Sequence, residues 1–127
     1  MWTKKKLDNQ KWIAMNREVA RLMQEEKLDE ALDLARDVFD YTRKCYGKKD
    51  RKTIVALNNI GTVNLLKKNF DEAEAHLLLA LQLSEKVSGK EGRQASMINM
   101  NLAELYSARA KSIRENIEVF GEQTPPG

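Results

Sequence analysis

The side chains that most often catalyse reactions are scarce in this sequence. His76 is the only histidine, cysteine occurs once, and no serine, histidine and carboxylate resemble a catalytic triad. The adjacent acids Glu25, Glu26 and Asp71, Glu72 stand where helices are expected to end or begin. This position indicates helix capping and solvation rather than a proton-transferring pair. The sequence also contains no phosphate-binding glycine loop and no metal-ligand spacing. We therefore expect a protein that is not an enzyme and that has no cofactor and no metal.

Two neighbouring amides offer a different chemistry. Asn58 and Asn59 lie inside residues 53–66, an otherwise apolar stretch that is typical of a helix packed on both sides. A buried amide costs free energy unless it finds hydrogen-bond partners. An amide can also donate to and accept from a peptide backbone at the same time. We therefore expect one of the two to line a groove for another chain.

Composition places the chain among soluble globular proteins of one domain. Its 127 residues are 42% hydrophobic and 32% charged, and no apolar run approaches the roughly 18 residues that a membrane-spanning helix needs. The amino-terminal segment has no signal core, and a single Cys45 suits a reducing compartment, so we expect a cytoplasmic protein without membrane contact. The net charge is only +3, and the basic residues gather only at 4–6 and 48–52. A nucleic acid is therefore not expected as a partner.

Helical periodicity recurs along the chain. Apolar residues are spaced by three and four over residues 12–23 and 28–41, and no window alternates as a strand would. A shift of 42 residues superimposes the sequence on itself, which indicates a structural repeat. There are two full units and the first half of a third. The aligned pairs include Asn16 with Asn58, Asp29 with Asp71, Gly47 with Gly89, Arg51 with Arg93 and Asn59 with Asn101.

Each unit reads as a helical hairpin. In the second unit, we expect a first helix from about Thr53, its N-cap, to Lys68, and a turn at Asn69. The second helix would then begin at Asp71 and stop at Gly89. Small residues mark a close approach of the two helices, notably Gly61, Ala73 and Ala80. Because glycine within a helix costs about 1 kcal/mol relative to alanine, Gly61 indicates tight packing.

The spacing of six residues resembles the signature of a tetratricopeptide repeat: Leu57, Ile60, Gly61, Ala73, Leu77 and Ala80. With its 42-residue period, the chain is most similar to the kinesin light chain type. The resemblance implies an all-α fold, an α-solenoid of antiparallel helical hairpins with about two and a half repeats and a C-terminal capping helix. It also implies a scaffold or adaptor that binds a peptide or partner helix on the concave face of the first helices.

The same resemblance assigns the groove residues. They are Ile13, Asn16, Ala20 and Met23 in the first unit, Val55, Asn58, Thr62 and Leu65 in the second, and Met97, Met100 and Glu104 in the third. The other asparagines, Asn59 and Asn101, are expected to hydrogen-bond within or between repeats. A mildly basic rim near the helix ends, from Lys27, Lys67, Lys68 and Arg109, would favour an acidic ligand.

The resemblance divides the chain into a basic segment 1–11, repeat one 12–47, repeat two 52–89, partial repeat three with the capping helix 93–120, and a disordered tail 121–127. Trp12 is expected to pack on the first hairpin, while Trp2 is free to be disordered, to dock in the groove of its own chain or to join a dimer. Residues after Tyr106 keep an apolar stripe of Ala110, Ile113, Ile117 and Phe120. The stripe either belongs to a separate capping helix over unit two or lies on one unbroken helix from about Gln94. The second arrangement would leave it in need of a partner, most simply another copy of the chain, so self-assembly into a homodimer is the alternative function.

Overall fold

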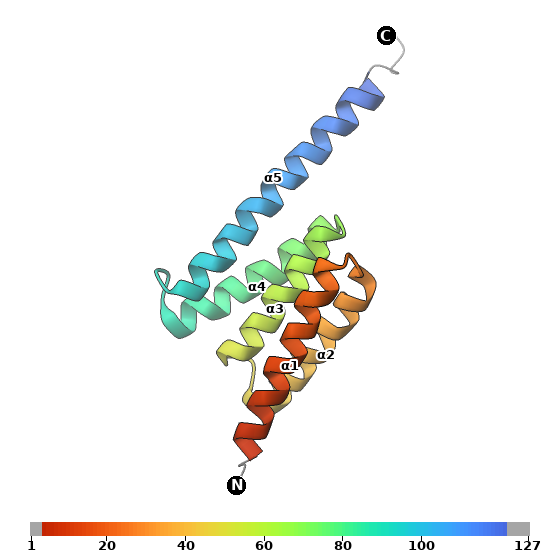
Figure 1. The fold of residues 1–127 in the computed structure, drawn as a ribbon. Helices are drawn as coiled ribbons and strands as arrows, with labels where there is room; N and C mark the ends of the chain where they lie inside the picture. The colour runs from red at the N-terminus through yellow and green to blue at the C-terminus, as the bar shows by residue number, and fades with distance from the viewer. Residues whose placement is uncertain (1–3, 122–127) are drawn as a thin grey trace.

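The computed structural model describes residues 4–121, which form five helices joined by short turns (Figure 1). Trp2 and residues 122–127 of the expected tail lie outside the described residues, as do the side chains of residues 4–7 and 120. None of the helices in residues 4–121 is both long and apolar enough to cross a membrane. The helices are α1 (Lys4–Gln24), α2 (Leu28–Tyr46), α3 (Arg51–Leu66), α4 (Phe70–Ser88) and α5 (Arg93–Gly121).

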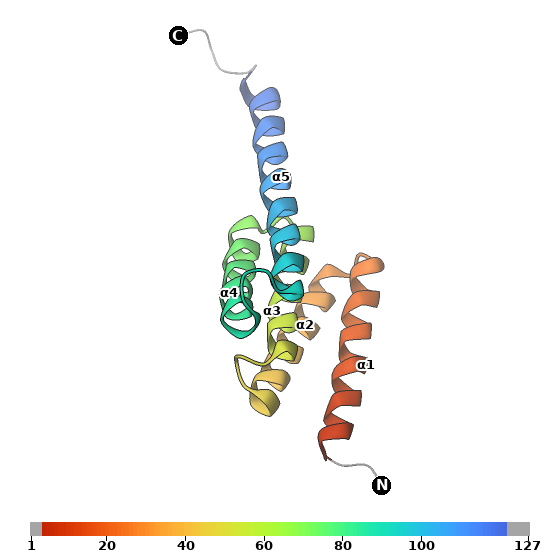
Figure 2. The same cartoon turned by 90° about the vertical axis from the view of Figure 1, so that its left-hand side faces the viewer.

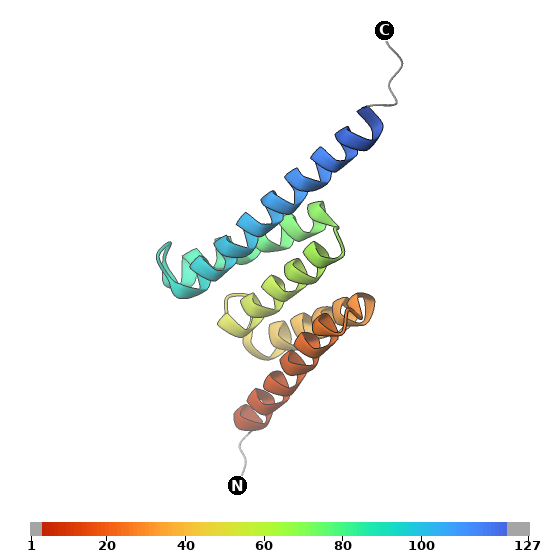
Figure 3. The same ribbon diagram turned by 45° about the horizontal axis from the view of Figure 1, so that its top comes forward.

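Each helix packs mainly against its neighbours in the sequence, and α3 also touches α5. Figure 3 shows the resulting stack, which ascends from α1 to α5. In Figure 2, α1 and α4 lie on opposite sides of the molecule, with α2 and α3 between them. The all-α solenoid of helical hairpins is therefore confirmed. The first helix is longer than expected: repeat one was expected to begin at residue 12, whereas α1 begins at Lys4 and includes most of the basic segment 1–11.

Two apolar clusters hold the stack together. The first joins α1, α2 and α3 around residues such as Val19, Val38 and Ile60. The half-buried Trp12 packs against it, as expected. The second cluster joins α3, α4 and α5 around Ile54 and Leu77. Since α3 supplies residues to both clusters, it is the helix that couples the two hairpins.

The turns of the two hairpins have the same backbone conformation, one period apart in the sequence. Glu26 and Lys68 have φ angles of 60° and 64°, and they follow the ends of α1 and α3. This left-handed residue lets the next amide bond back into the helix: the Asn69 N–H donates to the Asn64 carbonyl at 2.8 Å. Acidic pairs then open the second helices, Asp29 with Glu30 in α2 and Asp71 with Glu72 in α4, where the positive end of the helix dipole favours them.

The start of α3 differs from the expectation. Asp50, not Thr53, is the N-cap, because the Asp50 carboxylate accepts from the Lys52 N–H at 2.8 Å. Thr53 is fully buried, and its hydroxyl instead donates to the Gly47 carbonyl at 2.7 Å. The other ends agree with the prediction, since Gly47 and Gly89 terminate α2 and α4 with φ angles of 89° and 81°.

The close approach predicted at Gly61 is present. A Cβ at this position would lie 2.7 Å from Leu77 Cγ and Cδ2, and 3.3 Å from the Ala73 carbonyl oxygen. Both Ala73 and Leu77 are fully buried on α4. The glycine therefore allows α3 and α4 to pack closely. Its counterpart one period later, Ala103 on α5, is exposed.

Of the two arrangements left open for the third unit, the structure has the unbroken helix. α5 has 29 residues, against 16 in α3, and no separate capping helix folds over unit two within residues 4–121. At the position of Lys68, one period on, Ala110 continues the helix. Where Asp71 and Glu72 open α4, α5 carries Ile113 and Arg114. Because the acids that start a second helix are missing there, the chain has no local signal to turn.

Candidate functional site

The asparagines form a ladder between successive first helices. Asn59 donates its amide N–H to the Asn16 side-chain oxygen at 3.2 Å. One period later, Asn101 donates to the Asn58 oxygen at 2.9 Å. The prediction that Asn59 and Asn101 hydrogen-bond within or between repeats is confirmed, and both bonds run between repeats. Because the acceptor oxygens of Asn16 and Asn58 are already used in the ladder, these amides hold the repeats in register as well as facing the surface.

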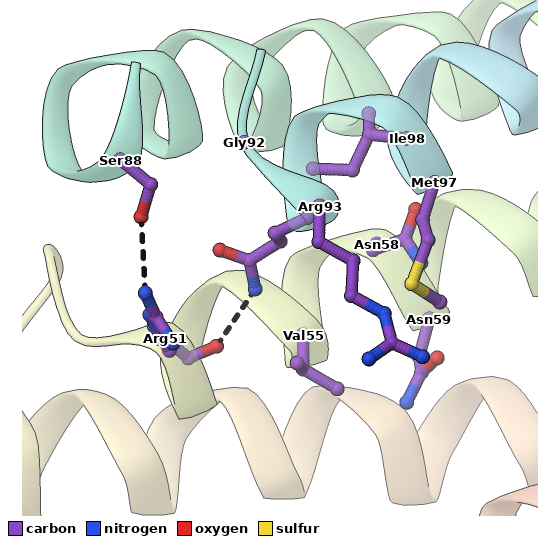
Figure 4. A pocket seen from close by; sticks show the side chains of 10 residues that line it. Arg51, Val55, Asn58, Asn59, Ser88, Gly92, Arg93, Met97 and Ile98 are labelled. Atoms are coloured by element: carbon purple, nitrogen blue, oxygen red, sulfur yellow. Dashed lines mark hydrogen bonds between the residues drawn. The ribbon is translucent and has the colours of Figure 1, made fainter. Parts of the chain in front are cut away.

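A pocket of about 520 Å³ opens between the N-terminal ends of α3 and α5 (Figure 4). Val55, Met97 and Ile98 give it apolar walls. Figure 4 shows the Arg93 side chain reaching toward Val55 and Asn59, with the Met97 sulfur beside it. The remaining lining residues are polar or small, namely Arg51, Asn58, Asn59, Ser88, Gly92, Arg93 and Gln94.

Hydrogen bonds fix the mouth of this pocket. The Arg51 guanidinium donates to the Ser88 hydroxyl at 3.4 Å, which joins the start of α3 to the end of α4. The Gln94 amide donates to the Arg51 carbonyl at 3.2 Å, which joins α5 to α3. The Gln94 Oε1 atom is buried and accepts no hydrogen bond within the described part of the chain. The pocket therefore combines an apolar floor, formed by Val55, Met97 and Ile98, with polar groups at its mouth.

The cations of the molecule differ in whether a carboxylate already neutralises them. At the turn end, Lys67 pairs with Asp29, and this contact lowers the pKa of the Asp29 carboxyl. Arg109 lies 3.3 Å from an Asp71 oxygen and 3.6 Å from one of Glu74. The basic rim expected there is thus largely satisfied by the protein's own acids.

The two arginines at the first pocket are in a different situation. Neither Arg51 nor Arg93 has an ion pair among the described residues. The first turn of α5 contains no acidic residue, and Glu91 stands two residues before it. Lys52, by contrast, lies 4.5 Å from the centre of the Tyr46 ring and is held there. Among the residues that line the first pocket, Arg51 and Arg93 therefore supply positive charge that no carboxylate of the described chain neutralises.

A second pocket, of about 350 Å³, lies at the other end of α3, against the middle of α5. Leu65, Leu66 and Phe70 supply its apolar part. Glu104, Lys111 and Glu115 place charges of both signs around it, so it has no net preference for anions. Ala108, Ser112 and Lys68 complete the lining.

The structure distributes the predicted groove residues over several environments. Val55, Asn58 and Met97 line the first pocket, and Leu65 and Glu104 line the second. Ile13, Ala20 and Met100 are exposed outside both pockets. Asn16, Met23 and Thr62 are half-buried and have partners of their own: Asn59, the first apolar cluster and the Asn58 carbonyl, respectively.

The expected trough is thus divided into two hollows, and neither is lined by a residue of α1. The half-buried Met23 packs against the first apolar cluster. Two important residues of the first pocket, Arg51 and Arg93, are absent from the predicted site. The sequence did contain a signal for them, because they occupy equivalent positions one period apart.

The candidate catalytic side chains have ordinary structural surroundings. His76 lies on α4 with its Nδ1 atom 2.8 Å from the Glu72 carbonyl oxygen, one helical turn away. Cys45 is exposed near the end of α2. Within the part of the chain that the structure describes, no group of three or more histidine, cysteine or acidic side chains is placed to hold a metal ion.

Comparison with known proteins agrees with this architecture. The family model for the tetratricopeptide repeat matches residues 14–86 and 53–113 in two overlapping alignments. Searches of curated proteins and of solved structures gave no match to the chain. Stacked repeats of this family present extended surfaces that mediate protein–protein interactions and are typically not enzymatic. The matched region covers most of the chain and both complete hairpins, so the protein belongs to the tetratricopeptide repeat family.

Proposed function

We propose that this protein is a non-enzymatic scaffold that binds an acidic peptide segment of a protein partner in the pocket between α3 and α5. The observation that carries the proposal is the combination of an apolar floor with two arginines that lack ion pairs in the described chain. A volume of about 520 Å³ lies within the range of ligand-binding pockets, roughly 300–1,000 Å³. It accommodates one or two side chains with the backbone between them.

The two parts of the pocket suit different parts of such a peptide. Val55, Met97 and Ile98 would enclose a large apolar side chain, and the flexible Met97 can adapt to its shape. Arg51 and Arg93 would contact neighbouring carboxylates, for which the planar guanidinium is well suited. Positive charge at the first turn of α5 adds to the same preference for an anion.

Because of the asparagine ladder, a substitution of Asn58 is not the best test of peptide binding in the pocket. Asn58→Ala would remove the acceptor of Asn101 as well as a lining side chain, so loss of binding and loss of stability would be mixed. Arg93→Glu and Met97→Glu avoid this problem. Arg93 is exposed in the first turn of α5, where an acid is favourable. Met97 is 55% exposed, so a glutamate there needs no repacking.

The test is a selection of random displayed peptides on the wild-type protein, followed by fluorescence anisotropy with the selected peptides. We expect them to combine a large apolar residue with Asp or Glu, and their affinity to fall as salt rises. Arg93→Glu and Met97→Glu should each weaken binding about tenfold or more, equivalent to roughly 1.4 kcal/mol. Equal binding by the wild type and Met97→Glu would contradict the proposed site.

A matched control separates the pocket from a general charge effect. Leu79 is 40% exposed on α4 and does not line either pocket. Leu79→Glu introduces the same charge as Met97→Glu at a comparably exposed apolar position. Binding should be unchanged in Leu79→Glu, and the thermal midpoints of all variants should agree closely with that of the wild type.

A further inference from the structure

The distal part of α5 carries an exposed apolar stripe on a helix that stands clear of the rest of the molecule. Figures 1 and 3 show this end of α5 extending beyond α1–α4. Residues 111–121 follow the point where the earlier repeats turn, and they add about 16 Å of helix at 1.5 Å per residue. Within this segment, Ile113 is 52% exposed and Ile117 is 64% exposed. A monomer gains nothing from placing these side chains in water.

The stripe continues the face by which α5 packs in the solenoid. Leu102 and Leu105 belong to the second apolar cluster. Three turns of helix further on, the same side of α5 presents Ile113 and then Ile117, at the helical spacing of four. No helix of the described chain covers this continuation, because the chain never turns back at Ala110. The face therefore has the character of an interface that lacks its second helix.

Charges along the segment determine which helix fits. Basic residues come first, Lys111 and Arg114, and acidic residues follow, Glu115 and Glu118. None of these four makes an ion pair within the described chain. Within one helix, a base four residues before an acid is the weaker orientation of such a pair. Glu115 lies two residues from both Ile113 and Ile117 and therefore points away from the stripe, whereas Arg114 and Glu118 flank the stripe on one side. An antiparallel copy of the segment would bring Arg114 to the same flank as Glu118 of the second copy, whereas a parallel copy would set like charges together.

We propose that the distal segment of α5 pairs antiparallel with the same segment of a second copy of this chain, forming a two-fold dimer. Ile113 of one copy packs beside Ile117 of the other, and the same contact recurs through the symmetry axis. In this register Arg114 lies on the same flank as Glu118 of the second copy, which gives two equivalent ion pairs. The pocket between α3 and α5 lies toward the other end of the helix, so this interface is independent of the proposed peptide site.

Sedimentation equilibrium of the full chain, from micromolar to near-millimolar concentration, tests the proposal. We expect reversible dimerisation in the wild type and a monomer at all concentrations for Ile117→Asp. Val119 is the matched control, since it is 56% exposed but points to the other side of the helix. Val119→Asp should dimerise within about threefold of the wild type, allowing for general charge repulsion. A wild type that stays monomeric throughout this range would overturn the proposal, and so would a dimer that survives Ile117→Asp.

Charge exchange tests the antiparallel register. Arg114→Glu alone and Glu118→Arg alone should each weaken dimerisation about fivefold or more, because each creates two like-charge contacts in the dimer. The double variant Arg114→Glu, Glu118→Arg should return to within about twofold of the wild type. Circular dichroism of each variant checks that the helix is retained. If the double variant dimerised no better than the single ones, the antiparallel pairing would be refuted.

Discussion

Replacing Gly61 with alanine tests the contact that sets the spacing of the second hairpin. The new Cβ would stand 2.7 Å from Leu77 Cγ and Cδ2, which is too short for carbon atoms in contact. Leu77 is fully buried in the second apolar cluster, between Ala73 and Ala80 on its own helix, so its side chain has little room to move away. Either α4 must move from α3 or Leu77 must leave its preferred rotamer.

The expected magnitude follows from two opposing terms. Alanine in place of glycine stabilises a helix by about 1 kcal/mol. Overpacking of a dense core costs about 1–3 kcal/mol. We therefore expect Gly61→Ala to lower the free energy of unfolding by about 1 kcal/mol on balance. Gly61→Val should lower it further, because valine gains less helix propensity and brings two more methyl groups against Leu77.

Urea denaturation followed by far-ultraviolet circular dichroism measures both changes. Ala103 occupies the equivalent position on α5, but there it is exposed and no further helix packs on it. Ala103→Gly should therefore be destabilising by about 1 kcal/mol through helix propensity alone. Glycine is thus favoured at one position and alanine at its counterpart. If Gly61→Ala proved more stable than the wild type, the packing argument would be wrong.

Three further predictions concern the ladder, an ion pair and a helix end. A double-mutant cycle of Asn58→Ala and Asn101→Ala should give a coupling energy of about 1 kcal/mol in urea denaturation, since the cycle cancels helix propensity; no coupling would contradict the ladder. Lys67→Met should raise the pKa of Asp29 toward its ordinary value in an NMR titration. Because the pKa of Asp29 is lower in the folded chain than in the unfolded chain, the Lys67–Asp29 pair stabilises the fold above the unfolded pKa of Asp29, and this stabilisation is lost as the pH falls through the folded pKa. An unchanged pKa of Asp29 in Lys67→Met would refute the pair. Gly47→Ala should lower the free energy of unfolding, measured by thermal denaturation, by about 1 kcal/mol. A Cβ at this position would meet no neighbouring atom, but the φ angle of 89° is unfavourable for alanine; an unchanged stability would contradict this backbone strain.

Much of the fold could be predicted because its signals are local. The apolar spacing of three and four specifies each helix, and the period of 42 residues specifies that hairpins recur. Gly61 and Ala73 mark the close contact because only small side chains permit it. Local signals also misled at one point. Thr53 and Asp50 are both good N-caps in isolation, and the choice between them depended on the Gly47 carbonyl, which attracts the Thr53 hydroxyl.

The candidate site was predictable only in part. Val55, Asn58 and Met97 line the first pocket, and their positions on the first helices follow from the repeat; that they contact a partner stays a prediction. Met23 is half-buried, packs against the first apolar cluster and lines neither of the two pockets. The kinesin light chain subtype, the peptide ligand and the dimer stay predictions.

The sequence by itself determined the helical class, the hairpin repeat and the residues at which α2 and α4 stop. These properties depend on interactions within a few residues along the chain, which spacing and residue type express directly. Only the tertiary structure decided that Asn58 pairs with Asn101 and that Arg51 and Arg93 meet at one pocket. Those outcomes depend on the distance and rotation between helices more than 40 residues apart along the chain, and this geometry is a result of core packing as a whole.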